Sequence, residues 1–187
     1  MQRFKYARSE WCCKQPRVTD AACVQQVSVY DETAERITFI GSLRYHRGPI
    51  LTISSTESMS KTMISSGTDG EIAIWDLSAM IDSVCAETAA DQLRTIQLEF
   101  DSNQKPVFTA KVHQSGINSL QCVPLSSESS TLQRVLVVTG GDDQSVSATA
   151  LRLERSTSEW QLEGIACIPL SHSSCVTGMS HSMSFWV

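Results

Sequence analysis

The chain has 187 residues, 41% of them hydrophobic, and a formal net charge of −5 at pH 7, so it can bury a sizeable core in one or two domains. There is no basic-then-apolar leader and no apolar run long enough to span a bilayer, which excludes a membrane-spanning class. The seven cysteines, an odd number without a Cys-x-x-Cys, fit reduced thiols buried as apolar residues. We therefore expect a soluble, cytoplasmic protein with no membrane partner.

Residues 1–22 are a basic N-terminal segment that we expect to be a loop or a damaged strand. Five cations against Glu10 give residues 1–17 a net charge of +4, which leaves −9 for the rest. The cations are Arg3, Lys5, Arg8, Lys14 and Arg17. A short basic arm either contacts nucleic acid or an acidic partner, or is simply a solvated terminus.

Residues 23–43 have the pattern of two strands. Val27 and Val29 alternate with polar residues, and this run closes in Tyr30-Asp31. The segment from Arg36 to Leu43 is the second expected strand. Both are interpreted below as parts of a repeat unit whose first half is missing.

Residues 46–77 form the clearest unit of the chain. His46 precedes the strand-like run at 50–53, and a Thr-Asp-Gly turn at 68–70 leads into an alternating strand that ends in Trp75-Asp76. His46 lies 29 residues before Trp75. These residues resemble a WD repeat, the four-stranded blade of a β-propeller.

The resemblance implies a hydrogen-bonded tetrad of His46, Ser65, Asp69 and Trp75. Asp69 would accept from His46, His46 would meet Ser65, and Ser65 would meet the indole N–H of Trp75. Buried polar groups need partners, so such a set is structural. A Ser-His-Asp hydrolase triad is the alternative, but the sequence has no nucleophile elbow or oxyanion loop. We expect no catalytic residues and no enzyme activity.

The blade at 46–112 would be completed by an outer strand at Val107–Val112. Residues 78–104 are interpreted as an insertion, with one or two helical turns at 78–91 as the alternative. Tyr30-Asp31 stands where Trp75-Asp76 stands, so 23–43 would supply the third and outer strands of an earlier blade.

A second unit, at 113–170, begins at His113. Residues 117–120 match 50–53, and a β-branched strand at 134–138 enters the next turn. Alignment of the turns places Thr139 and Asp143 on the tetrad positions, whereas Thr149-Ala150 occupies the Trp-Asp place. The loops at 125–133 and 154–161 would account for the unit's extra length. Asp142 beside Asp143 suggests a metal or acid-base pair, but neighbours on a tight turn point apart.

A third, truncated unit at 172–187 starts at His172, the last expected tetrad residue, with a first strand at 175–179. Trp186 follows His172 by only 14 residues, so the middle of this blade is missing. His172, Cys175 and His181 could be imagined as zinc ligands, but no fourth ligand is apparent. We expect no metal site.

The parsing predicts an all-β fold, a partial WD-repeat β-propeller over residues 23–187. It would be an open arc of about three blades, two near-complete and two partial. The histidines are 67 and 59 residues apart, against roughly 40–45 for a blade. Closed propellers need about 4–8 blades, so the open arc exposes unpaired strand edges. Expressed alone, the chain is expected to be poorly soluble or to associate.

A narrower resemblance comes from the segments at 113–120, 138–143 and 176–178, and from 68–70 followed by 74–77. They are similar to the C-terminal part of the WD repeat-containing protein six family. This resemblance implies a non-catalytic subunit that supports a partner enzyme, which methylates the 2'-O position of the tRNA wobble ribose. The chain would then associate with a tRNA 2'-O-methyltransferase and, through the complex, with tRNA.

The chain itself has no Gly-rich loop of the kind that opens an S-adenosylmethionine site, so no cofactor is expected. The alternative function is a general WD-repeat protein-interaction scaffold, such as a signalling or ubiquitin-ligase adaptor. The acidic balance outside the basic segment suits that alternative slightly better. Fold alone does not choose between the two.

Overall fold

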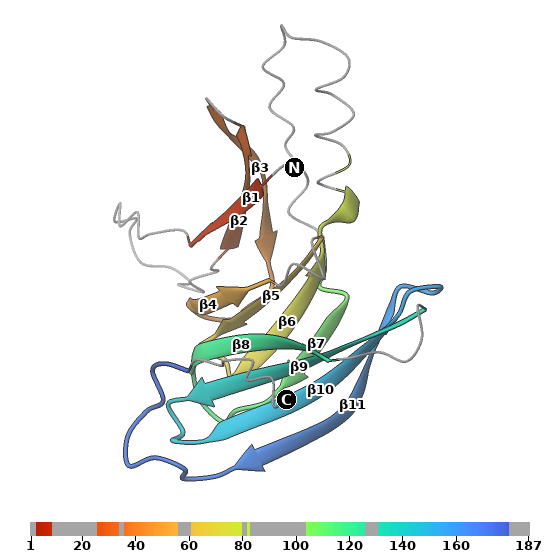
Figure 1. The fold of residues 1–187 in the computed structure, drawn as a ribbon. Coiled ribbons are helices and arrows are strands. Elements are labelled where there is room, and N and C mark those ends of the chain that lie inside the picture. Colours follow the sequence, from red (N-terminus) through yellow and green to blue (C-terminus); the bar gives the residue numbers. More distant parts are fainter. Residues whose placement is uncertain are drawn as a thin grey trace, which may run out of the picture.

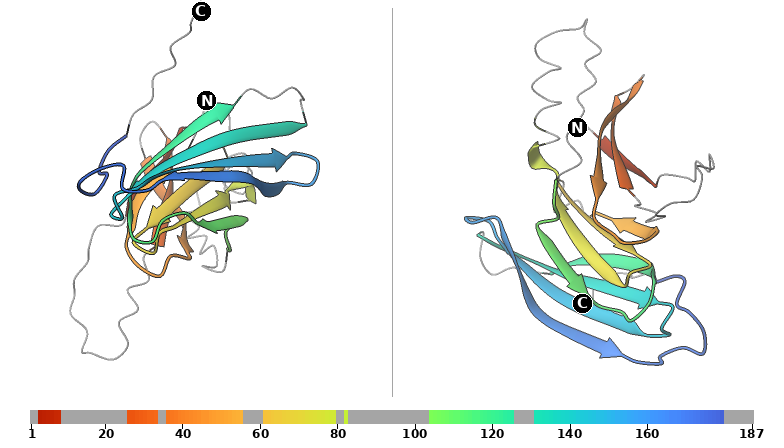
Figure 2. Two further views of the ribbon diagram at one scale, coloured as in Figure 1. Left: turned by 90° about the horizontal axis from the view of Figure 1, so that it is seen from below. Right: turned by 180° about the vertical axis from the view of Figure 1, so that it is seen from behind.

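A computed structural model describes residues 3–8, 26–33, 36–55, 61–79, 82, 104–125 and 131–179. The strands in these ranges form three antiparallel sheets, one of three strands and two of four, which follow one another in chain order (Figure 1). Two further views show that the sheets do not close into a ring (Figure 2). The predicted all-β, open architecture is confirmed.

The first sheet has the order β1-β2-β3, with β1 at Arg3–Arg8, β2 at Gln26–Thr33 and β3 at Arg36–Arg44. The two strands predicted within residues 23–43 are β2 and β3. Of the two alternatives for residues 1–22, a loop or a damaged strand, the loop is corrected for residues 3–8, because all six residues of β1 pair with β2; residues 9–22 lie outside the described residues. Phe4 and Tyr6 alternate with Arg3 and Lys5, which is the period-2 pattern of a strand and was overlooked in the sequence interpretation.

The second sheet has the order β4-β5-β6-β7, with β4 at Ile50–Ser54, β5 at Thr62–Gly67, β6 at Glu71–Asp76 and β7 at Phe108–Lys111. The strands predicted at 50–53 and 107–112 are β4 and β7. In the central pair, Met63 lies opposite Trp75 and Ser65 lies opposite Ala73. All four side chains are buried, so β5 and β6 are the core of this sheet.

After β6, Ser78, Ala79 and Asp82 are helical, which agrees with the alternative of a helical turn at the start of residues 78–91. The rest of the expected insertion, 80–81 and 83–103, lies outside the described residues. Within the described ranges, no helix combines the length and apolarity that a membrane crossing requires.

Gly70 closes the turn between β5 and β6 with a φ of +74°, a conformation that favours glycine. A Cβ there would overlap the main-chain oxygen of His113, because the chain returns to this turn after β7. The amide groups of Val112 and His113 both donate to the Gly70 carbonyl, at 3.0 and 3.1 Å. The turn therefore binds the beginning of the next sheet directly.

Replacing Gly70 with alanine should lower the free energy of unfolding. Positive φ alone costs a residue with a side chain about 1–3 kcal/mol, and the overlap with backbone adds to this. Urea unfolding monitored by circular dichroism measures the loss. The matched control is Gly164→Ala, because a Cβ at Gly164 meets nothing within 4 Å. Similar losses for both variants would contradict this role of Gly70.

The third sheet has the order β11-β10-β9-β8, with β8 at Ile117–Leu125, β9 at Leu132–Gly141, β10 at Val146–Glu154 and β11 at Glu159–Ile168. The loop expected at 154–161 is shorter than predicted, because β10 and β11 extend into it and leave only residues 155–158 as a turn. Strands β9, β10 and β11 have 10, 9 and 10 residues. Long strands therefore account for part of this unit's extra length.

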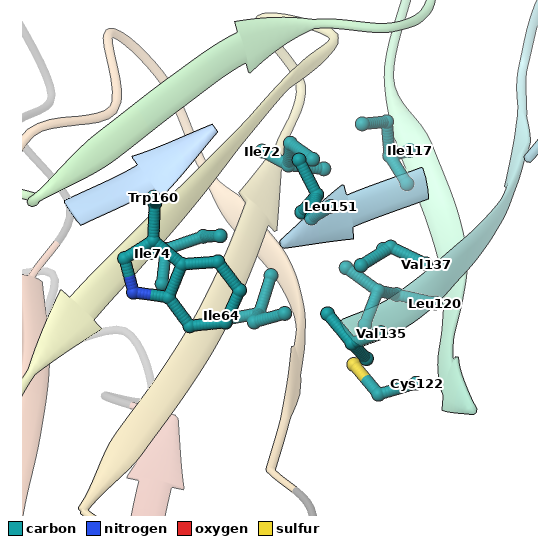
Figure 3. Close-up of a cluster of buried hydrophobic side chains, with 10 residues drawn as sticks. All are labelled: Ile64, Ile72, Ile74, Ile117, Leu120, Cys122, Val135, Val137, Leu151 and Trp160. Atoms are coloured by element: carbon teal, nitrogen blue, oxygen red, sulfur yellow. The ribbon is translucent and has the colours of Figure 1, made fainter. Parts of the chain in front are cut away.

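The second and third sheets pack face to face around a buried apolar cluster (Figure 3). Ile64, Ile72 and Ile74 contribute from the second sheet. The third sheet contributes Ile117, Leu120, Cys122, Val135, Val137, Leu151 and Trp160. Burial of this apolar surface is the main favourable term that holds the two sheets together.

Candidate functional site: a polar network in each four-stranded sheet

In the second sheet the structure brings His46, Ser65, Asp69 and Trp75 together. His46 Nδ1 lies 3.1 and 3.0 Å from the two carboxylate oxygens of Asp69, and its Nε2 lies 2.9 Å from Ser65 Oγ. The indole N–H of Trp75 donates to Ser65 Oγ at 2.9 Å. A carboxylate only accepts and an indole only donates, so Nδ1–H donates to Asp69 and the Ser65 hydroxyl donates to Nε2.

Asp69 also accepts hydrogen bonds from backbone amides of two segments that flank the network. Its carboxylate accepts from the amide of Arg47 at 3.1 Å and from the amide of Glu71 at 3.2 Å. The loop before β4 is thereby tied to the turn between β5 and β6. Ser65 is fully buried and His46 is 2% exposed, so neither could reach a substrate as a hydrolase triad would require. The geometry supports a structural network.

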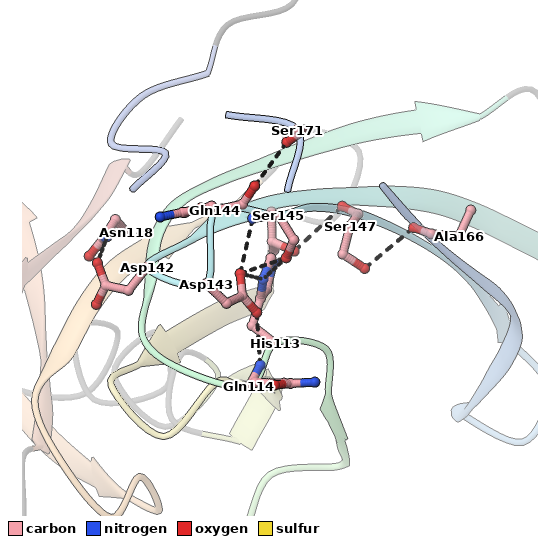
Figure 4. Close-up of polar contacts among 11 residues, drawn as sticks. His113, Gln114, Asn118, Asp142, Asp143, Gln144, Ser145, Ser147, Ala166 and Ser171 are labelled. Atoms are coloured by element: carbon pink, nitrogen blue, oxygen red, sulfur yellow. Dashed lines mark hydrogen bonds and ion pairs between the residues drawn. The ribbon is translucent and has the colours of Figure 1, made fainter. Parts of the chain in front are cut away.

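In the third sheet the corresponding network contains His113, Thr139 and Asp143. Figure 4 shows His113 and Asp143 side by side. His113 Nδ1 lies 2.9 Å from Asp143 Oδ1, and Nε2 lies 2.9 Å from Thr139 Oγ1. The amide of Gln114 donates to Asp143 Oδ2 at 2.9 Å, as that of Arg47 does to Asp69. The two sheets are therefore closed by the same arrangement of loop, turn and strand.

Thr149 occupies the place that Trp75 has in the second sheet. It is fully buried, and its Oγ1 has no hydrogen-bond partner among the described residues. Thr139 Oγ1 therefore receives no indole N–H. The network in this sheet lacks its fourth member, as the sequence indicates.

Ser145 is a member of the third sheet's network that the sequence argument missed. Its hydroxyl donates to Asp143 Oδ1 at 2.5 Å and lies 2.9 Å from His113 Nδ1. Glu71 stands at the equivalent position, two residues after Asp69, and contributes only its amide. A serine two residues after a turn aspartate is a local signal that could have revealed this contact.

Hydrogen bonds set the ionisation of Asp143. Partial burial acts to raise its pKa, but the Ser145 hydroxyl, the Gln114 amide, His113 and the Ser145 amide together lower the pKa well below its ordinary value. Because the folded pKa is below the unfolded one, this group stabilises the fold above the unfolded pKa of about 3.9. The contribution is lost as the pH falls from there through the folded pKa.

We expect Asp143→Asn to destabilise the chain at neutral pH, with a difference from the wild type that shrinks below about pH 4. Urea unfolding at a series of pH values measures this difference. Asn118→Ala serves as the control, because Asn118 donates to the neighbouring Asp142 and not to Asp143. A difference that stays constant from neutral to acidic pH would contradict the assignment.

His172 does not join a network of this kind within the described residues. It is exposed, and its amide donates to the Gln144 carbonyl at 3.3 Å. The first strand expected at 175–179 is not formed, which is a correction to the sequence interpretation. A strand needs a neighbour to pair with, and no described strand pairs with these residues.

The metal alternatives gain no support from the geometry. Asp142 accepts from Asn118, whereas Asp143 accepts from His113, so the two neighbouring carboxylates serve different partners (Figure 4). His181, the third imagined zinc ligand, lies outside the described residues. Among the residues that are described, no group of three or more His, Cys, Asp or Glu side chains could hold a metal ion.

Cys122 is a buried thiol in the apolar cluster between the second and third sheets. Burial raises its pKa to about 11, although a hydrogen bond with Ser54 acts in the opposite direction. A thiol of this kind stays protonated at neutral pH and is a poor nucleophile. Its role is packing.

Two four-stranded antiparallel sheets, each closed by a His-Asp-Ser/Thr network between its first loop and its central turn, define WD-repeat blades of an open β-propeller. The predicted fold class is confirmed. The tRNA (34-2'-O)-methyltransferase regulator WDR6 of Bos taurus is 31% identical to this chain over an alignment of 130 residues, which covers 63% of this chain and 11% of that protein. This partial match confirms the resemblance to the WD repeat-containing protein six family.

Among solved structures, one described as the structure of Dos1 propeller matches with a TM-score of 0.40 and 17% identity, over 82% of this chain and 30% of that one. No family model matches the sequence. The chain spans only a small part, 11%, of the WDR6 protein that it matches.

Proposed function

We propose that this chain is a non-catalytic WD-repeat subunit that supports 2'-O-ribose methylation of the tRNA wobble nucleotide by a partner methyltransferase. The observation that carries the proposal is the 31% identity over 130 residues to a protein named as a regulator of tRNA (34-2'-O)-methyltransferase. The proposal includes a cytoplasmic location.

The polar residues of the blades support a non-catalytic role. His46, Ser65 and Trp75 are buried and serve one another, and His113 is likewise buried against Thr139 and Asp143. These two networks therefore stabilise the sheets and leave none of these buried side chains facing a substrate. Chemistry on the ribose would belong to the partner.

Affinity purification of the tagged chain, with and without RNase, tests the proposal. We expect a methyltransferase that remains bound after RNase treatment, and tRNA that is removed by it. A protein partner without methyltransferase or tRNA would instead favour the interaction-scaffold alternative. In a second measurement, deletion of the gene should lower ribose methylation at the tRNA wobble position, and an unchanged methylation level would contradict the proposal.

A further inference from the structure

The third sheet has an apolar face that turns away from the second sheet. Alignment of Ser65 with Thr139 and of Asp69 with Asp143 relates its residues to those of the second sheet. Val138, Val146 and Ala148 then correspond to Ile64, Ile72 and Ile74. The three isoleucines are fully buried beneath the third sheet, whereas their counterparts are only half-buried. The face thus has the composition of a sheet interface but is less buried than its counterpart in the second sheet.

The residues after β11 begin to cover this face along the same path as the start of β8. The His172 amide donates to the Gln144 carbonyl, as the His113 amide does to the Gly70 carbonyl. Gln144 also shares the positive φ of Gly70, at 63° against 74°. The third sheet therefore ends in the geometry that, at the end of the second sheet, starts a new blade.

Val176 shows that this path has the correct register. It follows His172 by four residues, as Ile117 follows His113 and Ile50 follows His46, and all three apolar side chains are buried. The Val176 amide donates to the Gly141 carbonyl at 3.1 Å. Gln121 Nε2 donates to the Met179 carbonyl at 3.3 Å. Residues 172–179 thus occupy the place of an innermost strand that has no described neighbour to pair with.

The first sheet has the opposite deficiency. β3 leads into the innermost strand β4 as β7 leads into β8, so β3 corresponds to β7, β2 to β6 and β1 to β5. Within the described residues, nothing in the first sheet corresponds to β4. Among the described strands, none pairs with β1 on the side where an innermost strand would lie.

We propose that two copies of this chain associate head to tail, with residues 172–179 of each copy supplying the missing innermost strand to β1 of the other. The composite blade covers the apolar face of the third sheet. Three sheets from each of two copies make six blades, within the roughly 4–8 of closed propellers. The two-fold arrangement covers the apolar face of the third sheet and gives β1 a pairing partner on its free side among the described strands.

The register of the composite blade follows from the second sheet. Ile53 pairs with Ser65 there, and Met179 is the counterpart of Ile53. Lys5 lies opposite Tyr30 as Met63 lies opposite Trp75, so Ala7 is the counterpart of Ser65. Met179 of one copy should therefore lie opposite Ala7 of its partner. Opposed strand residues are about 5 Å apart, within the range that a disulfide bridges.

The experiment mixes chains carrying Met179→Cys with chains carrying Ala7→Cys, oxidises them and maps the cross-links by peptide mass spectrometry. We expect a disulfide that joins positions 7 and 179 of different copies, and it cannot form when either variant is oxidised alone. A further sample uses a chain that carries both substitutions, Ala7→Cys and Met179→Cys. If the 7–179 disulfide forms only within single copies of that chain and not between copies, the proposal is overturned.

Light scattering on the intact 187-residue chain supplies an independent readout, with twice the monomer mass as the expected result. Ala148→Glu places a charge on the proposed interface and should produce a folded monomer. Leu162→Glu is the matched control on β11, where the side chain is already 46% exposed, and should leave the dimer intact. A monomeric wild type, or a dimer lost with Leu162→Glu but kept with Ala148→Glu, would overturn the proposal.

Discussion

Replacing Trp75 with alanine should lower the free energy of unfolding by about 3–5 kcal/mol, the range found for buried tryptophan and phenylalanine side chains. Trp75 has the largest of the fully buried side chains among the described residues. Its ring contacts Tyr45 edge-on, with ring centroids 6.5 Å apart, and its N–H is bonded to Ser65. The variant therefore loses apolar burial, an aromatic contact and a buried hydrogen bond together.

Thr149→Ala is the matched control, because Thr149 holds the same position in the third sheet. It removes a methyl group, but it also removes a buried hydroxyl without a partner, so we expect a change of less than about 1 kcal/mol. Urea unfolding followed by far-ultraviolet circular dichroism avoids the change in tryptophan fluorescence. Equal losses in the two variants would show that the indole does not anchor the second sheet.

The turn and histidine spacing allowed the most reliable sequence predictions. A Thr-Asp-Gly turn requires positive φ at Gly70, and this pins the register of β5 against β6. Once the register is known, Ser65 and Trp75 must lie on adjacent strands. Local chemistry of this kind is visible in a sequence because a single conformation satisfies it.

Features that depend on backbone pairing or on distant neighbours were not predictable in the same way. The turn at 155–158 contains no glycine, although Ser158 takes a φ of +56°. The sequence therefore has no glycine signal for this short connection between β10 and β11. The innermost strand expected at 175–179 has the correct residues, and Val176 is buried, but its pairing depends on a strand elsewhere. Tertiary context decides whether such a segment becomes a strand.

The second sheet contains two adjacent serines with opposite expected behaviour. Ser65 and Ser66 are both fully buried, but only Ser65 has hydrogen-bond partners, whereas Ser66 Oγ has none among the described residues. Ser65→Ala leaves His46 Nε2 and the Trp75 N–H without partners. An unsatisfied buried group costs about 1–3 kcal/mol, so we expect a loss of about 2–5 kcal/mol for the two together.

Ser66→Ala removes a single hydroxyl that is already desolvated and unpaired, and it should leave stability unchanged or raise it by up to about 1 kcal/mol. The two variants remove the same atom from neighbouring positions of one strand, so strand propensity and side-chain volume cancel in the comparison. Urea unfolding at neutral pH gives both values. Equal effects would mean that burial alone, and not the His46 and Trp75 contacts, determines the contribution of Ser65; a clear loss for Ser66→Ala would mean that its hydroxyl is paired after all.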